Sequence, residues 1–385
     1  MVKEYPFGIL FSVSGSYGTI GRSLLNGAML ACQQINGDPD FGIRLKPVFC
    51  DPGSDLSAYA PAVENLLAQG ISQVVGCYTS SSRKEVIPVF EKRDALLWYP
   101  THYEGFESSA NVIYTGSAPN HHILPLVDYL VRHVGRRVFC VGSNYIWGWE
   151  SNRVLREELA SRRGQVVGER YLAVGETDVE CLIQAIFEAE PDVVFNSLIG
   201  DSAYAFFREF RKACEARGID QIKRYPIASC NLSEPELDSI GPEAIEGHLS
   251  SSVYFASIAT DENRQFVSCY QAAFPLEHAP CAEAEAAYIA VILLAKSLRA
   301  ANSDALRAVK TCAAHQRLSA PQGEVSIDPN TLHAYLTPRI GRSRKDGQFD
   351  IIFDAGRPVA PDPYLINSSS TLEAPSLRPT LRIVS

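Results

Sequence analysis

The chain has 385 residues, a formal net charge of -9 and a sequence pI of about 5.5. This length favours two or more domains, and 46% hydrophobic with 21% charged residues is typical of a globular protein with a large core. The negative charge, without a concentrated basic run, argues against direct binding of nucleic acid or of anionic membranes. The sequence contains no run of about 18 uninterrupted apolar residues, so we expect no membrane span.

The cysteines and the N-terminal residues bear on the compartment. Ten cysteines are spread singly along the chain, without a CxxC pair, and such cysteines are typical of buried, reduced thiols. The first residues lead straight into an apolar run at 7–11, with no apolar leader of signal-peptide length before it. We therefore expect a cytoplasmic protein, with a periplasmic location as the alternative if a signal peptide has been removed.

Strands and helices alternate in the first part of the chain. We expect strands at residues 7–12, 45–50, 73–76 and 95–98, separated by helices at about 21–35, 57–67 and 84–93. This alternation predicts a parallel sheet with helices on both faces. In such sheets, ligands bind beyond the carboxyl ends of the strands.

A second alternating unit follows a short strand and a first crossing at 111–120. Its expected strands lie at 137–141, 165–172, 192–197 and 225–229, and a second crossing follows at 250–255. Three helices come next without a strand between them, which suits a return to the first unit. With a third crossing near 320, we predict an N-terminal lobe of residues 1–118 and 256–320, a C-terminal lobe of residues 119–255 and 321–355, and an extended tail at 356–385.

Rings and hydroxyl groups gather at the predicted strand ends of both units. They carry scarcely any charge, which favours a small, neutral, polar ligand held by hydrogen bonds and shielded from water by rings. Two alternatives stay open: Ser80 can be an ordinary helix-capping serine, and Asp201 can cap the helix that follows it. The candidate ligand-binding residues are Tyr78, Ser80, Tyr99, Thr101, Tyr145, Trp147, Asp201 and Tyr254.

Catalytic and cofactor motifs are missing from the sequence. GxSxG, GxGxxG and GxxxxGK[ST] do not occur, so we expect no nucleotide or other cofactor. His121 and His122 are adjacent and face apart on a helix, which disfavours a metal site. Cys77, Lys84 and Glu104 are the residue types of an amidase, but their spacing matches no known motif. We therefore expect a binding protein and not an enzyme.

Several segments resemble those of two related groups of receptors. One group is the AmiC-like amide sensors, which are cytoplasmic negative regulators of bacterial aliphatic amidase operons. The other is the urea and short-chain-amide binding proteins of ABC transporters. Both have the type I periplasmic-binding-protein fold, so the resemblance implies an α/β protein with two parallel-sheet lobes, joined by three crossovers around a hinged cleft. The segments are GCYTSSSRK (76–84), YPTHYEGFESSANVIYTGSAPN (99–120), GSNYIW (142–147), AEAAY (284–288) and PDPYL (361–365).

The resemblance also implies roles for single residues. In the amide sensors, the serine of GCYxS and the Tyr-Pro-Thr of the next strand line the pocket; here these are Ser80, Tyr99 and Thr101. The second-lobe Tyr-Ile-Tyr of the sensors corresponds to residues 145–147, where Trp147 replaces a phenol by an indole. Residues 196–202 also depart from the sensors and look more like the transport branch, in which Asp201 can accept a hydrogen bond from an amide NH2.

On this basis we expect a sensor of a small neutral amide, similar to acetamide, or of urea. By resemblance it releases an RNA-binding antiterminator protein when the ligand closes the cleft. The alternative is the solute-binding receptor of a urea or short-chain-amide ABC transporter. The identity of the amide is not predicted, because one methylene changes the binding free energy by only about 1 kcal/mol. The sequence does not predict whether identical chains assemble into an oligomer.

Overall fold

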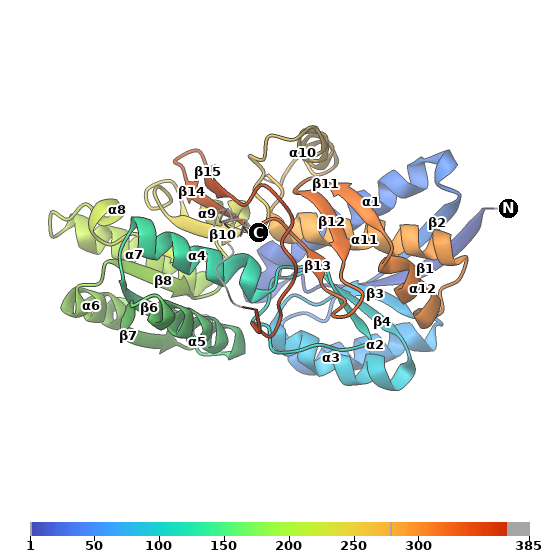
Figure 1. Cartoon of the computed structure of the whole chain (residues 1–385), viewed down its shortest axis with the longest axis horizontal. Coiled ribbons are helices and arrows are strands. Elements are labelled where there is room, and N and C mark those ends of the chain that lie inside the picture. Colours follow the sequence, from blue (N-terminus) through green and yellow to red (C-terminus); the bar gives the residue numbers. More distant parts are fainter. Residues whose placement is uncertain (1, 278, 368–385) are drawn as a thin grey trace, which may run out of the picture.

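The computed structural model describes residues 2–277 and 279–367. They form two lobes that lie side by side, each around its own mainly parallel sheet (Figure 1). The chain passes between the lobes three times: after β5 (Val112–Tyr114), after β10 (Leu249–Ser252) and before β14 (Arg339–Ser343). The two parallel-sheet lobes and the three crossings agree with the prediction from the sequence.

The first lobe contains a five-stranded parallel sheet in the order β2-β1-β3-β4-β5. Its middle strands are buried along their whole length, because helices cover both faces of a parallel sheet. The other strands are β1 (Lys3–Leu10), β2 (Ile43–Cys50), β3 (Gln73–Gly76) and β4 (Leu96–Tyr99). The helices are α1 (Gly18–Gly37), α2 (Tyr59–Ala68), α3 (Ser80–Arg93), α10 (Asp261–Ala273), α11 (Ala282–Ala301) and α12 (Leu306–Ala313), with short 3-10 turns η1 (Gly15–Tyr17), η2 (Pro39–Phe41) and η3 (Leu56–Ala58).

Helices α1 and α11 pack closely although they come from distant parts of the chain (Figure 1). A Cβ atom at Gly27 would lie 2.0 Å from the backbone oxygen of Ala284, so only glycine allows the two backbones to approach this far. Helix α11, which follows the second crossing, thus packs on the first lobe.

The second lobe contains a seven-stranded sheet in the order β15-β14-β10-β9-β8-β6-β7, in which β14 and β15 run antiparallel. The remaining strands are β6 (Arg137–Ser143), β7 (Gln165–Leu172), β8 (Val193–Ser197), β9 (Ile227–Ser229) and β15 (Phe349–Asp354). The helices are α4 (Pro119–His133), α5 (Ile146–Ser161), α6 (Glu180–Ala189), α7 (Asp201–Glu215), α8 (Gln221–Arg224) and α9 (Glu234–Ile240).

In the part of the chain that the structure describes, no helix has the length and apolar character needed to cross a membrane.

A small antiparallel sheet of β11 (Arg317–Ala320), β12 (Gly323–Ile327) and β13 (Ala334–Tyr335) moves the boundary between the lobes. Val325 and Ile327 of this sheet, and Leu336 directly after it, join the core of the first lobe. The third crossing therefore lies between Leu336 and β14, and not near residue 320 as predicted. β13 therefore belongs to the first lobe, whereas β14, which begins four residues later, belongs to the second.

Residues 356–367 form a strap that contacts both lobes. On the second-lobe side, Asn120 at the start of α4 donates to the oxygen of Ala360 at 2.8 Å. On the first-lobe side, the backbone N–H of Phe106 donates to the oxygen of Pro363 at 2.8 Å. Only Val359 in this segment makes a β-bridge, to Leu336, so the described part of the predicted tail is largely irregular in secondary structure but well connected. Residues 368–385 of that predicted tail lie outside the described residues.

Candidate functional site

A cavity of about 10 Å³ lies between the lobes, at the carboxyl ends of the strands. This volume leaves room for about one water-sized group. We call its two sides the first wall and the second wall, after the lobes that supply them. The first wall consists of Tyr17, Tyr78, Thr79, Ser80, Thr101 and His102, and the second wall of Tyr145, Trp147, Ile199 and Asn231.

The first wall begins at the turn between β3 and α3. Cys77 has a φ of 65°, and this left-handed residue turns the chain at the end of the strand. Thr79 is the N-cap of α3, because its hydroxyl accepts the backbone N–H of Ser82 at 3.1 Å. Ser80 is therefore not the capping residue. Its hydroxyl is free for another role and donates to the carboxylate of Glu104 at 2.5 Å.

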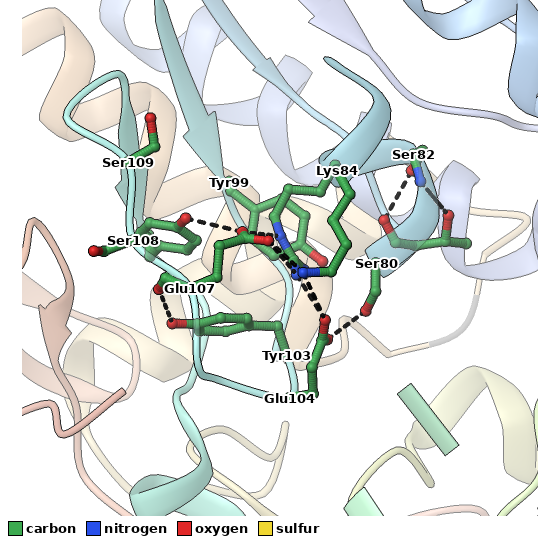
Figure 2. A network of polar contacts seen from close by, with 12 residues as sticks. Ser80, Ser82, Lys84, Tyr99, Tyr103, Glu104, Glu107, Ser108 and Ser109 are labelled. Carbon is green, nitrogen blue, oxygen red and sulfur yellow. Dashed lines mark hydrogen bonds and ion pairs between the residues drawn. The ribbon is translucent and has the colours of Figure 1, made fainter. Parts of the chain in front are cut away.

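A buried ion cluster supports the first wall from behind (Figure 2). We call it the Arg83 network; it consists of Arg83, Lys84, Glu104 and Glu107. The Arg83 side chain is 0% exposed and lies 2.9 Å from Glu104 and 2.7 Å from Glu107. Lys84 lies 2.6 Å from Glu107. Burial disfavours the charged guanidinium, but Tyr99 and the two carboxylates outweigh that effect and hold the pKa of Arg83 well above its ordinary value.

His102 brings a second buried carboxylate close to the cavity. Its Nδ1 lies 3.2 Å from Glu283 at the start of α11, and its ring packs edge-on against Trp147 at 5.4 Å. Burial alone would raise the pKa of Glu283, but the hydrogen bond from His102 and its charge lower it overall. Burial, and to a smaller extent the carboxylates of Glu236 and Glu283, raise the pKa of Tyr78 well above its ordinary value, so this phenol keeps its proton.

The second wall carries two buried polar atoms without a partner among the described residues. They are Nε1 of Trp147, which only donates, and Oδ1 of Asn231, which only accepts. Nδ2 of Asn231 donates to the backbone oxygen of Leu198 at 3.0 Å, and this bond fixes which way the amide points. Buried polar atoms of this kind normally have partners, so a donor and an acceptor left open on one small cavity suggest a bound group that supplies both.

The structure brings five of the predicted residues together on the cavity: Tyr78, Ser80, Thr101, Tyr145 and Trp147. The other three lie elsewhere. Tyr99 stands behind the first wall, where its ring covers Arg83 at 4.8 Å and its hydroxyl donates to the oxygen of Tyr78. Asp201 is exposed at the first position of α7, after the N-cap Gly200. Tyr254 is buried in the second crossing and donates to Asn263 at 2.8 Å.

Three residues of the cavity were not among the predicted site residues: His102, Ile199 and Asn231. Each follows a β-strand of the parallel sheets, so the strand-end rule that selected Tyr78 and Thr101 could have found them. Asn231 was overlooked because it is a single amide directly after a short strand, β9, with no ring or hydroxyl beside it that signals a site.

The amidase arrangement considered from the sequence is not assembled at the cavity. Cys77 is fully buried, and burial raises the pKa of its thiol to about 12, so it carries no reactive thiolate near neutral pH. Lys84 and Glu104 pair with other members of the Arg83 network instead. Within residues 2–277 and 279–367, no group of three or more His, Cys, Asp or Glu side chains is arranged to hold a metal ion.

Comparison with solved structures finds the same fold over nearly the whole chain in solute-binding proteins. A solute-binding protein of an ABC transporter from Rhodopseudomonas palustris HaA2, in complex with p-hydroxybenzoic acid, has a TM-score of 0.83 at 20% identity and covers 95% of this chain and 100% of that one. A solute-binding protein from R. palustris in complex with benzoate has a TM-score of 0.81 at 18% identity, covering 93% and 98%. The branched-chain amino acid binding protein LivJ from Streptococcus pneumoniae, in complex with isoleucine, has a TM-score of 0.79 at 20% identity, covering 93% and 100%.

Sequence comparison matches part of this chain to a curated relative and nearly all of it to a family model. A curated relative named limonene hydroxylase, from Geobacillus stearothermophilus, is 26% identical over 129 residues, which are 34% of this chain and only 24% of that protein. The family model described as periplasmic binding protein domain matches residues 5–370. The family is thus described as one of periplasmic binding proteins, and the structural neighbours include solute-binding proteins. The chain therefore belongs to the periplasmic binding protein family, with the type I fold that its sequence predicted.

Proposed function

We propose that this chain binds a small neutral amide, such as acetamide, or urea in the cavity between its lobes. One observation carries the proposal: Trp147 Nε1 and Asn231 Oδ1 lack partners among the described residues and belong to side chains that line the same small cavity. An amide or urea carries a carbonyl acceptor beside N–H donors, so a single ligand can satisfy both atoms. A buried polar atom left without a partner costs about 1–3 kcal/mol, so filling both favours binding.

The size and charge of the cavity support the same ligand class. With a volume of about 10 Å³, the cavity is far too small for the benzoates and the isoleucine bound by the structural neighbours, and it has to widen least for a ligand of four heavy atoms such as acetamide or urea. Those ligands also carry a carboxylate. Among the lining residues, only His102 can carry a positive charge, and it is paired with Glu283. A neutral ligand therefore suits the site better than an anion.

Trp147 provides a direct test, because it lines the cavity while Trp98 is buried in the core and Trp149 is 46% exposed. Acetamide and urea are titrated into the protein while tryptophan emission and heat of binding are recorded. We expect saturable binding with an emission change that disappears in Trp147→Phe. Benzoate and isoleucine serve as controls of matched concentration. Binding of either control, with no response to amides or urea, would overturn the ligand class.

For the biological role, we propose a cytoplasmic amide sensor that acts through a partner protein. In this role the ligand-free chain holds an RNA-binding antiterminator and releases it when an amide closes the lobes, so that amidase-type genes are expressed. The ten free cysteines support a reducing compartment, and the negative charge suits a chain that leaves RNA binding to its partner. Co-purification of an antiterminator without acetamide, and its loss at saturating acetamide, is the expected result.

The second candidate is the receptor of an ABC transporter for urea or short-chain amides. It is favoured by the structural neighbours, which are described as ABC-transporter solute-binding proteins. The two candidates share the ligand and differ in compartment and partner. Fractionation of the host cell distinguishes them: recovery with cytoplasmic markers favours the sensor, and recovery with periplasmic markers favours the transport receptor.

A further inference from the structure

We propose that the Glu104–Arg83 pair makes Ser80 a hydrogen-bond acceptor toward the ligand, so that the site selects ligands with an N–H group. This inference rests on the proposed function, because it explains how a site for amides rejects neutral carbonyl compounds of the same shape. Ser80 touches the ligand in this scheme, whereas Glu104 and Arg83 act through it as positioning residues.

The first step concerns the single proton of the Ser80 hydroxyl. Ser80 Oγ donates to Oε2 of Glu104 at 2.5 Å, and Glu104 is 2% exposed. A carboxylate has no proton to offer, so this hydrogen bond uses the only one that Ser80 has. Figure 2 shows the Ser80 side chain pointing at Glu104. Toward the cavity, Ser80 is left with lone pairs alone.

The second step concerns what keeps Glu104 an acceptor. Nη2 of Arg83 donates to Oε1 of Glu104 at 2.9 Å, and the guanidinium lies between the rings of Tyr99 and Tyr103, 4.8 Å from each centroid. Arginine carries five N–H donors and no acceptor. With Arg83 on one oxygen and Ser80 on the other, both oxygens of Glu104 accept hydrogen bonds.

The third step accounts for the lone pairs of Ser80. A hydroxyl oxygen accepts up to two hydrogen bonds. Tyr145 of the second wall lines the same cavity, and its phenol can donate to one of these lone pairs. The remaining lone pair serves an N–H of the ligand. Acetamide and urea offer such a donor, and acetone, which has the same shape, does not.

The decisive variant is Glu104→Gln. Because Arg83 can only donate, it holds the amide oxygen of the new glutamine, and the amide N–H2 then faces Ser80. Ser80 now receives a hydrogen bond on its oxygen and turns its own proton toward the cavity. Its role toward the ligand is reversed from acceptor to donor, with little change in the volume of the side chain.

The matched control is Glu107→Gln. Glu107 also binds Arg83 and Lys84, at 2.7 and 2.6 Å, but it makes no hydrogen bond to Ser80 among those of the described residues. Both variants leave Arg83 with one carboxylate and remove one negative charge from the same cluster. A difference between them therefore reports the orientation of Ser80 and not the general loss of charge.

The experiment measures dissociation constants for acetamide, urea and acetone by calorimetry with the full chain. We expect the wild-type protein to prefer acetamide over acetone by about tenfold, the value of one hydrogen bond. Glu104→Gln should reduce this ratio by about tenfold, and Glu107→Gln should leave it unchanged. In a Ser80→Ala background, Glu104→Gln should no longer affect the ratio.

The outcomes that contradict the inference are distinct from those that contradict the proposed function. Equal ratios in Glu104→Gln and Glu107→Gln, with amide binding intact in the wild type, overturn it and leave the proposed function standing. A wild-type protein that binds neither acetamide nor urea overturns both. If Glu104→Gln does not fold, as judged by circular dichroism, Ser80→Ala takes its place: it should lower the ratio by about tenfold, and an unchanged ratio overturns the inference.

Discussion

The two walls of the cavity differ in how their polar groups are satisfied. Behind the first wall, Ser80, Glu104 and Arg83 already form a chain of charge-assisted hydrogen bonds, in which only Nη1 of Arg83 has no partner among the described residues. On the second wall, Trp147 Nε1 and Asn231 Oδ1 have no partner among the described residues. One wall is therefore set before a ligand arrives, while the other gains hydrogen bonds only when something fills the cavity.

This difference suggests how ligand binding favours the closed arrangement of the lobes. A ligand shifts an equilibrium only by interacting more strongly with one state than with the other. The hydrogen bonds that join Ser80, Glu104 and Arg83 lie within the first lobe, so they do not depend on the position of the second lobe. The open donor and acceptor of the second wall reach a ligand on the first wall only when the lobes are together, so they supply the free energy of closure.

The largest effect is expected from removing the charge behind the first wall. In Arg83→Met, Glu104 and Glu107 lose their buried cation, which should lower the free energy of unfolding by about 3–5 kcal/mol in urea denaturation. Arg153→Met is the control, because the side chain of Arg153 is 30% exposed and pairs with Glu150 and Glu157 at the surface. Its loss should lower the free energy of unfolding by less than about 1 kcal/mol. Similar losses in both variants would show that the first wall does not depend on its buried charge.

Glu285 sharpens the comparison, because it is buried like Glu104 but faces an amide instead of a cation. Gln322 Nε2 donates to it at 2.9 Å, and burial raises the pKa of Glu285 to about 8. The folded protein then keeps a proton that the unfolded chain has lost, so this group makes stability fall as pH rises from about 4.5 to about 8.

Glu285→Gln removes that slope. Relative to the wild type, the variant should gain on the order of 3 kcal/mol in free energy of unfolding between about pH 5 and pH 9. Urea unfolding across this range measures it, and the difference between the two proteins isolates Glu285 because all other groups titrate in both. Parallel pH profiles would place the pKa of Glu285 at its ordinary value.

On the second wall we expect an effect on binding and little on folding. Trp147→Phe keeps a ring in the cavity and removes an N–H that has no partner among the described residues, so stability should change by less than about 1 kcal/mol. Acetamide affinity should fall about tenfold in calorimetry. Trp149→Phe is the control, because Nε1 of Trp149 donates to Asn144 at the surface. This variant should bind acetamide with the affinity of the wild type. A loss of stability with unchanged affinity would reverse the roles assigned to the two walls.

The smallest effect concerns the extent of the second wall. Asp201 is exposed in the first turn of α7 and does not line the cavity, so its carboxylate acts on the helix dipole. Asp201→Asn should lower stability by about 0.5 kcal/mol and leave acetamide affinity unchanged. A loss of affinity of about tenfold or more would extend the wall to Asp201, as the resemblance to the transport branch implied.

The sequence predicted the parts of the fold that depend on local pattern. Alternating apolar strands and helices are visible over residues 7–98 and 137–229, and they became the two sheets. The third crossing was placed too early because β11 and β12 pair with each other over the turn at Pro321–Gln322, which resembles a linker in sequence. Only the burial of Val325 and Ile327 in the first lobe, a long-range contact, reveals where they belong.

The site was predicted where a residue follows a strand and points into the cleft. Tyr78, Ser80, Thr101, Tyr145 and Trp147 meet this condition. Tyr99 satisfied the same pattern, but its side chain points to the other side of the strand, where it covers Arg83. The partnership of Ser80 with Glu104 spans 24 residues and depends on the shape of the loop after β4, so no spacing rule could have disclosed it.

The packing of α1 on α11 has a consequence for the order in which the chain folds. Gly27 and Ala284 meet across more than half of the sequence, so the core of the first lobe closes only after α11 has left the ribosome. The second lobe is different: all of its strands except β14 and β15 come from residues 137–252. During synthesis, the strands of the first lobe therefore remain without the cover of α11 while the second lobe folds. We expect their exposed apolar surface to make the first lobe the part of the protein that depends most on a chaperone.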